Sequence, residues 1–257
     1  MKFYKCVDPE GHYGMVYKEG LNVDILPFDP SGDCNPGGIY FSRENILSFL
    51  HHGEDLYEVE PVGEVYENPG HPKKWKAHEV ELKFVGKRSD PVVIQRLLGE
   101  GASVNYCTAS DLYWYVSSSK LELVKVLLEN GISPVVRRML LRITAGDGQL
   151  EIVKLLLDSG IDIHTDCDFA LRCAIEAGQL DTVKLLIEYG GDIHVKESYT
   201  LWAAAFCGNP EIIKFLLECG LDPFIYDKWA AKNKTALTKR HPEIVELIKE
   251  AQAVGGA

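Results

Sequence analysis

The sequence predicts an α+β protein made of a small mixed α+β domain at residues 1–88 and an all-α repeat solenoid at residues 89–257. One observation is a set of glycines at positions 101, 131, 160, 190 and 220, spaced 29 or 30 residues apart, each closing a similar apolar segment. The other is a change of pattern before residue 89, where alternating, β-branched and aromatic residues are typical of strands.

The segments that end at these glycines have the pattern of amphipathic helices. They are LELVKVLLENG, LEIVKLLLDSG, LDTVKLLIEYG and PEIIKFLLECG, with a fainter copy, PVVIQRLLGEG, at residues 91–101. In the second copy the apolar residues share one helical face: Ile152, Val153, Leu156 and Leu157. We expect each closing glycine to adopt the left-handed conformation that ends a helix, because glycine reaches it without steric cost.

A second, shorter helix is expected in each unit before the closing segment. The candidates are LLRITAGDG, ALRCAIEAG and LWAAAFCG, whose last glycines are Gly148, Gly178 and Gly208. Their small side chains allow neighbouring helices to pack closely. Each unit is therefore predicted to contain a helix, a tight glycine turn, a longer helix, a glycine cap and an extended connection.

These residues resemble the ankyrin repeat, whose consensus includes TPLHLAA, a glycine turn, EIVKLLL and GADVN. GIDIH at residues 160–164 and GGDIH at 190–194 occupy the GADVN position, and Leu171 and Leu201 take the place of the leucine of TPLH. The TPLH motif is missing, and the spacing is shorter than the usual period of about 33 residues. The shortening falls in the projecting finger, so the resemblance implies an ankyrin-repeat solenoid with shortened fingers.

We expect about four full repeats with a half-repeat cap at each end. Terminal repeats differ from internal ones because a neighbour covers only one of their faces. In the last unit Lys249 stands where internal copies have an apolar residue, and Gln252 replaces the closing glycine. At the other end, residues 91–101 have no evident first helix and are expected to abut the preceding domain.

The N-terminal region contains strand-like segments that begin at residues 2, 13, 21, 38, 56 and 76: KFYKC, YGMVYK, LNVDIL, GIYFS, LYEVEPVGEV and KAHEVELKFVG. One helix, capped by Ser42, is expected to present Ile46, Leu47 and Leu50, and a linker is expected near residues 88–90. The order of these segments is similar to a domain that precedes ankyrin-type repeats in giant DNA viruses of the mimivirus kind. That resemblance implies no catalytic chemistry.

Composition restricts the functional classes. The 257 residues carry a net charge of −11, which argues against nucleic acid as a partner. No apolar run approaches 18 residues, and the N-terminal residues lack the apolar stretch of a signal peptide. We therefore expect a soluble intracellular protein without a membrane partner. The seven cysteines form no CxxC pair and are expected to be reduced and partly buried.

No metal or cofactor is predicted. His164 and His194 are equivalent by the repeat, and ankyrin repeats place a polar residue such as Asn105 in this position to bond the turn backbone. His51 and His52 are adjacent, so on a helix their side chains diverge by about 100° and do not chelate one ion.

The N-terminal domain leaves an enzymatic alternative open. Glu79 and Glu81 lie on one side of a predicted strand, an arrangement that resembles ADP-ribosyltransferases. The arginine expected near the start of that family is absent, and Lys5 is nearest to its place. Cys34, in a glycine- and proline-rich loop, is a second candidate nucleophile, although a packed or simply exposed thiol explains it as well. We predict no catalytic residue.

The main hypothesis is a non-catalytic scaffold or adaptor that binds a protein through the concave face of the solenoid. Residues next to the helix turns and connections are the candidate contacts: Tyr106, Arg137, Arg138, Asp166, Asp168, Glu176, Lys196, Glu197, Tyr199 and Phe206. If the chain is viral, we expect a host protein as partner and the host cytoplasm as location. The alternatives are an N-terminal small-ligand or nucleotide-using module that the repeats deliver, and a structural virion component. The sequence predicts no oligomeric state.

Overall fold

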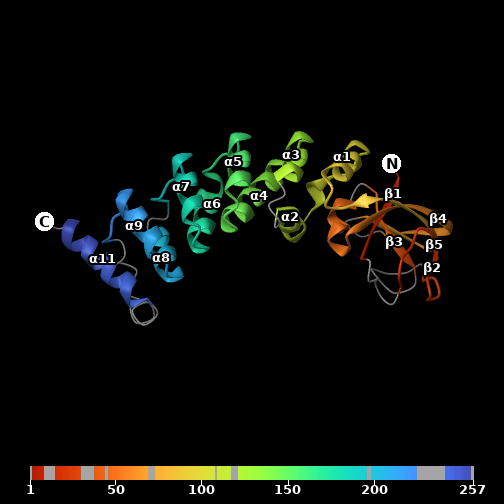
Figure 1. Ribbon diagram of the computed structural model, residues 1–257, viewed down its shortest axis with the longest axis horizontal. Coiled ribbons are helices and arrows are strands. Elements are labelled where there is room, and N and C mark those ends of the chain that lie inside the picture. The colour runs from red at the N-terminus through yellow and green to blue at the C-terminus, as the bar shows by residue number, and fades with distance from the viewer. Residues whose placement is uncertain are drawn as a thin grey trace. The chain divides into compact units, whose positions relative to one another are not determined.

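In the computed structural model the chain forms a strand-rich region followed by helical repeats (Figure 1). The structure describes residues 2–8, 15–29, 38–43, 46–68, 73–107, 109–116, 121–195, 198–224 and 241–255. The chain divides into two compact units, Met1–Val136 and Arg137–Ala257. The strands end at Lys87 and the first α-helix begins at Pro91. The domain boundary near residue 88 stays a prediction.

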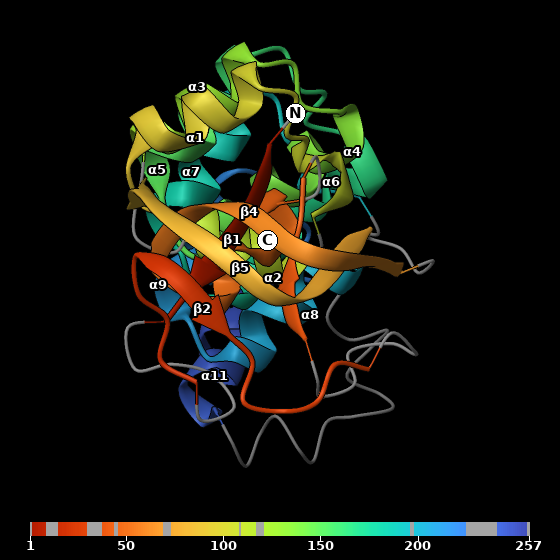
Figure 2. The ribbon, with the colours of Figure 1, turned by 90° about the vertical axis from the view of Figure 1, so that its right-hand side faces the viewer.

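The first unit contains an antiparallel sheet in the order β1-β4-β5-β2, with β3 also paired to β5 (Figure 2). Its strands are β1 (Phe3–Val7), β2 (Gly20–Val23), β3 (Ile39–Phe41), β4 (Asp55–Asn68) and β5 (Lys74–Lys87). The two longest strands, β4 and β5, pair along their whole length, with irregularities in the register that bend them. This hairpin is the frame to which the three shorter strands attach.

Apolar side chains from β3, β4 and β5 form the core of the sheet: Ile39, Phe41, Val59, Trp75, Ala77, Val80 and Leu82. Phe3 of β1 closes this core, because its ring meets Phe41 and Trp75 edge to face, with centroids 4.8 and 5.3 Å away. Each such aromatic pair stabilises a fold by about 0.5–1.5 kcal/mol more than the burial of its surface area alone. The other face is also covered in part, because Tyr4 and Cys6 of β1 are buried as well.

Two details of the N-terminal prediction were wrong. The expected helix is a 3-10 helix, η1 (Ile46–His52), and not an α-helix. The backbone of Ser42, its predicted cap, pairs with Tyr4 in both directions, and its hydroxyl donates to the carbonyl of Lys73 at 3.1 Å. Of the strand expected at residues 13–18, the described residues 15–18 show only a bridge at Met15.

The junction between the sheet and the first helix is held by several hydrogen bonds. The carboxylate of Glu54 accepts from Arg88 Nε at 2.9 Å and from the hydroxyl of Ser89 at 2.6 Å. Asp90 caps α1 (Pro91–Gly99) by accepting from the backbone N–H of Val92. The expected linker at residues 88–90 is therefore attached to the sheet.

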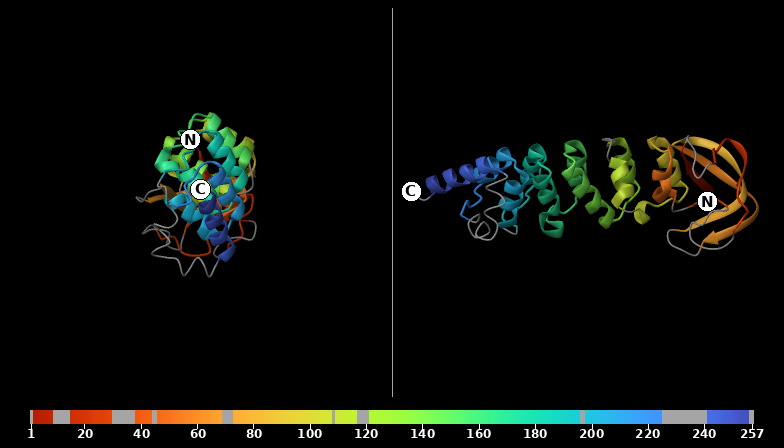
Figure 3. Two further views of the ribbon diagram at one scale, coloured as in Figure 1. Left: turned by 90° about the vertical axis from the view of Figure 1, so that its left-hand side faces the viewer. Right: turned by 90° about the horizontal axis from the view of Figure 1, so that it is seen from below.

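The remaining helices continue the repeat. The first unit also holds η2 (Val104–Tyr106), α2 (Ala109–Val116) and α3 (Leu121–Glu129), and α4 (Pro134–Gly146) crosses the division. The second unit contains α5 (Leu150–Asp158), α6 (Thr165–Glu176), α7 (Leu180–Glu188), α8 (Ser198–Cys207), α9 (Pro210–Glu218) and α11 (Pro242–Gly255). Its helices follow one another in chain order (Figure 3), with α6 and α8 in one row and α5, α7 and α9 in the other (Figure 1).

The predicted glycine caps and apolar helix faces are present in the structure. The closing glycines all have positive φ, from 72° at Gly131 to 96° at Gly101 and Gly190. The apolar face predicted for α5 is buried, with Leu156 fully inaccessible. In two units the first helix is not the shorter one, however, since α4 and α8 have 13 and 10 residues against nine in α5 and α9.

The last helix has the features expected of a cap. In α11, Ile244 and Ile248 are fully buried whereas Lys249 is exposed. Gln252 occupies the place of a closing glycine, and its amide donates to the carbonyl of Pro223 at 3.0 Å. Among the described residues, no helix is both long enough and apolar enough to cross a membrane.

Candidate functional site

The repeat brings aromatic and arginine side chains of α4, α6 and α8 into one continuous series. The guanidinium of Arg142 lies 5.1 Å from the ring centroid of Phe169, and that of Arg172 lies 4.5 Å from the same ring. Arg172 also lies 5.4 Å from the ring of Tyr199 on the next repeat. We name the whole series the aromatic–arginine row: Arg142, Phe169, Arg172, Tyr199, Trp202 and Phe206.

The aromatic end of the row lies along α8. Tyr199, Trp202 and Phe206 are three and four residues apart and therefore share one helical face. The ring centroids of Tyr199 and Trp202 are 5.1 Å apart, and those of Trp202 and Phe206 are 5.3 Å apart and stacked. Phe206 is 43% exposed, so part of its ring faces solvent.

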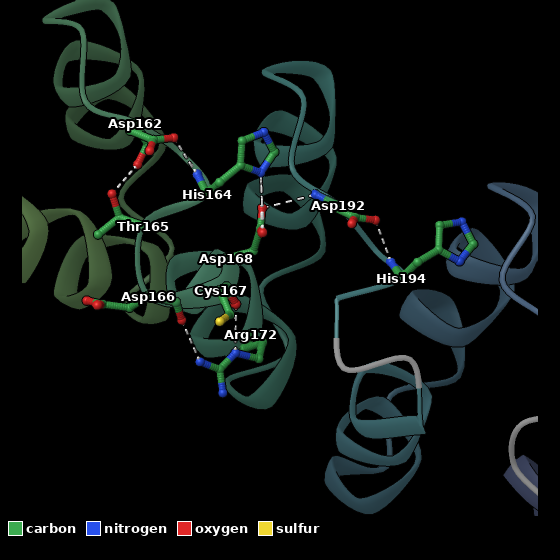
Figure 4. Close-up of polar contacts among 9 residues, drawn as sticks. All are labelled: Asp162, His164, Thr165, Asp166, Cys167, Asp168, Arg172, Asp192 and His194. Atoms are coloured by element: carbon green, nitrogen blue, oxygen red, sulfur yellow. Dashed lines mark hydrogen bonds and ion pairs between the residues drawn. The ribbon is translucent and has the colours of Figure 1, made fainter.

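A left-handed backbone segment lies directly before the helical part of α6 (Figure 4). Asp166, Cys167 and Asp168 have φ values of 54°, 59° and 50°. Left-handed conformations cost residues other than glycine roughly 1–2 kcal/mol each and seldom occur in succession. Arg172 holds the segment, since its Nε donates to the carbonyl of Cys167 at 3.2 Å and its Nη2 to that of Asp166 at 3.1 Å. Arg172 thus connects this turn to the aromatic–arginine row.

Asp168 is an internal acceptor and not a surface contact. It is 1% exposed, and its carboxylate accepts from the backbone N–H of Asp192 at 3.0 Å in the next repeat (Figure 4). Its two oxygens lie 3.1 and 3.3 Å from Nδ1 of His164. Because the side chain is buried and already bonded, we exclude Asp168 from the predicted partner contacts.

The histidines only partly follow the expectation for their position. Asn105 does bond a turn, accepting from the backbone N–H of Ser133 at 3.0 Å. In the later repeats the aspartates do so, since Asp162 accepts from the backbone N–H of His164 at 2.9 Å and Asp192 from that of His194 at 2.8 Å. Within the described part of the chain, no group of three His, Cys, Asp or Glu residues is arranged to hold a metal ion.

The other predicted contacts are dispersed. Arg137 and Arg138 are half-buried on α4, and Arg137 Nη1 donates to the carbonyl of Ser159 at 3.5 Å. Asp166 is exposed, and the exposed Glu176 accepts a hydrogen bond from the hydroxyl of Tyr199. The side chain of Tyr106 and both residues 196 and 197, predicted as Lys196 and Glu197, lie outside the described residues. Their part in binding stays a prediction.

The predicted contacts did not include Arg142, Phe169, Arg172 and Trp202. The repeat period contained a signal for them, because Phe169 and Tyr199 are 30 residues apart, as are Arg142 and Arg172. The contacts were predicted at helix turns and connections, whereas Arg142, Arg172 and Trp202 lie inside helices. Trp202 is partly buried in the row.

The residues of the enzymatic alternative lie on different strands. Lys5 is on β1 and Glu79 and Glu81 are on β5, with β4 between them. Lys5 Nζ donates to the carbonyl of Tyr40 at 3.0 Å and lies 4.6 Å from the ring centroid of Tyr17. Burial lowers the pKa of Lys5 to about 8. Residue 34, the predicted Cys34, lies outside the described residues.

The cysteines are less buried than expected. Cys6 and Cys107 are buried, and burial raises the pKa of both thiols to about 12. Cys167, Cys207 and Cys219 are exposed. The expectation that the cysteines fill partly buried repeat positions therefore does not account for these three residues.

The tandem helix pairs, their glycine caps and the shared helical face define an ankyrin-type repeat protein. A family model described as Ankyrin repeats (3 copies) matches residues 112–197, 140–227 and 174–254. Together these matches span more than half of the chain, which therefore belongs to the ankyrin-repeat family. Ankyrin repeats are protein–protein interaction modules, and the family is typically non-catalytic.

Two similar proteins, both of Acanthamoeba polyphaga mimivirus, are named as ankyrin repeat proteins. One is 32% identical over 123 residues, which cover 44% of this chain and 40% of the relative. The other is 40% identical over 52 residues, or 20% of this chain and 16% of the relative. The matches thus span less than half of either relative. The predicted similarity to ankyrin proteins of mimivirus-like giant viruses is confirmed.

Proposed function

We propose that the chain is a non-catalytic adaptor whose repeats, residues 89–257, bind a protein partner through the face that carries the aromatic–arginine row. The observation that supports this most directly is the row itself, which extends over three consecutive first helices. Aromatic residues and arginine are the side chains that most often dominate the energy of protein interfaces. In this proposal residues 1–88 form the N-terminal domain that precedes the repeats.

The row is also preorganised for binding. Arg172 is fixed by two backbone carbonyls, and Trp202 is held between the rings of Tyr199 and Phe206. Side chains that are already ordered lose less conformational entropy in a complex, a saving of about 0.5–1.5 kcal/mol for each one. The relatives are mimivirus proteins, so we propose a host protein in the host cytoplasm as the partner.

A quantitative capture experiment tests this face. The tagged full chain and a variant with Trp202→Ala and Phe206→Ala are incubated with lysate of amoebae, and the retained proteins are crosslinked and quantified by mass spectrometry. We expect one or more partners crosslinked to α6 or α8 on the wild type, with recovery reduced at least tenfold on the variant.

The matched control carries Lys154→Ala and Lys214→Ala. These exposed residues lie on α5 and α9, in the other row of helices. We expect wild-type recovery, and circular dichroism melts compare the folding of all three proteins. Equal recovery by both variants would show that the partner uses another surface.

A further inference from the structure

We propose that Arg138 and Arg142 form a carboxylate-binding subsite at one end of the aromatic–arginine row. The occupant is an extended segment of the protein partner with an Asp or Glu side chain about four residues from an apolar one. This inference rests on the proposed function and specifies the chemistry of the partner.

Arg142 differs from Arg172 in what its hydrogen-bond donors contact. Both guanidiniums lie over Phe169, but Arg172 donates to the backbone carbonyls before α6. Among the residues that the structure describes, no carboxylate lies within ion-pair distance of Arg138 or Arg142. A guanidinium stacked on a ring keeps its N–H donors at the edge of its plane, where they match a carboxylate in a bidentate pair.

Arg138 adds a second charge to the same position. It lies four residues before Arg142 on α4 and therefore on the same helical face. Like charges at this spacing destabilise a helix by about 0.2–0.5 kcal/mol, which a bound anion would offset. Glu176 accepts the hydroxyl of Tyr199, and among the described residues it forms no ion pair with Arg138 or Arg142.

The spacing along the row sets the expected length of the motif. Packed helices are about 8–10 Å apart, so the step from the α4–α6 contact to α8 is roughly 12–15 Å. An extended chain advances about 3.3 Å per residue, so four residues span that distance. A segment whose acidic side chain meets Arg142 would then bring an apolar side chain to Trp202 and Phe206.

The charge of the whole chain limits how acidic the occupant is. With a net charge of −11, the protein repels a polyacidic segment at long range. The same repulsion disfavours a doubly charged phosphate relative to a single carboxylate. One or two carboxylates beside apolar residues therefore fit the surface better than an acidic run.

Selection from a phage-displayed random peptide library on the immobilised full chain tests the motif. We expect enriched peptides to carry Asp or Glu about four residues from an aromatic or aliphatic residue. The affinity of one such peptide is then measured by fluorescence anisotropy on the wild type, on Arg138→Gln with Arg142→Gln, and on the matched control Lys154→Gln with Lys214→Gln. We expect at least a tenfold loss for the arginine variant and less than a twofold change for the control.

A double-mutant cycle separates a direct contact from a general effect of charge. Replacing the acid of the peptide by its amide should weaken binding at least tenfold on the wild type and less than twofold on the double arginine variant. Arg142→Lys should bind with intermediate affinity because it keeps the charge but loses the planar fork. Thermal melts by circular dichroism confirm that each variant is folded.

Several outcomes would overturn the carboxylate assignment: no enrichment, enriched peptides without an acid, independent effects in the cycle, or tighter binding of a phosphoserine version. If Phe206→Ala abolishes binding but the cycle shows no coupling, only the subsite is wrong. If Phe206→Ala and the arginine variant both bind normally, the proposed binding face fails as well.

Discussion

At the scale of single residues, the glycines of this chain have two different environments. The closing glycines, such as Gly160, have open space where a Cβ would be added. The turn glycine Gly208 does not, because an added Cβ would lie 2.3 Å from the ring of His241 in the following unit. Both glycines have positive φ, 86° and 75° respectively, so the two positions are alike in backbone conformation and differ in packing.

This difference predicts unequal effects of the same substitution. Gly160→Ala should lower the free energy of unfolding by about 1 kcal/mol, the conformational cost alone. Gly208→Ala should lower it by roughly 2–4 kcal/mol, because the imidazole must also move from its packed position. Urea denaturation followed by circular dichroism measures both, and equal losses would show that His241 does not contact the glycine in solution.

Some single-residue features could not be read from the sequence. The left-handed run at Asp166–Asp168 looks like an ordinary helix start, because acidic residues are favoured in a first turn. Its conformation depends on two hydrogen bonds from Arg172, five and six residues further along α6, and on one from the backbone of Asp192 in the next repeat. The predicted unit has an extended connection here, before the helix candidate at residues 170–178, and the structure has a left-handed turn instead.

At the scale of elements, prediction succeeded where one short pattern both repeats and determines the structure. The apolar faces and glycine caps of α5, α7 and α9 follow from local spacing alone. In the sheet, two strands were predicted at residues 56–65 and 76–86, but β4 and β5 each extend over 14 residues. Pairing between the two strands continues beyond the predicted segments into polar residues, whose types do not by themselves favour a strand.

The turn before α6 gives a prediction at this scale. Arg172→Lys should release the carbonyls of Asp166 and Cys167, since an ammonium does not reproduce the two-point contact. We expect stability to fall by about 1–2 kcal/mol and amide hydrogen exchange at residues 165–168 to accelerate at least tenfold. Arg142→Lys is the matched control, because Arg142 stacks on the same ring and makes no backbone hydrogen bond among the described residues. Similar effects of both substitutions would contradict a clamping role for Arg172.

At the scale of the whole molecule, the first repeat depends on the sheet that precedes it. Tyr4 of β1 is fully buried, and its hydroxyl donates to Glu100 just after α1. Arg96 pairs with the same carboxylate at 3.0 Å, and these contacts hold the pKa of Glu100 below its usual value. In a solenoid an end repeat needs a cap on its outer face. Within residues 1–136 the sheet occupies that position for α1.

Removal of residues 1–88 should therefore destabilise the chain from one end. Each repeat of a solenoid is stabilised mainly by its neighbours, so loss of the sheet should act most strongly on α1–α3 and weaken toward α9. We expect hydrogen exchange in the 89–257 fragment to be at least tenfold faster than in the full chain at residues 91–129. At residues 180–218 the exchange rates of the fragment and the full chain should differ by less than twofold.

Tyr4→Phe in the full chain should raise exchange at residues 91–101 without affecting α7 and α9, because it removes one contact and leaves the sheet in place. Uniform acceleration in the fragment would instead mean that all the repeats unfold as one cooperative unit, and unchanged exchange at residues 91–129 would show that the sheet does not support the first repeat.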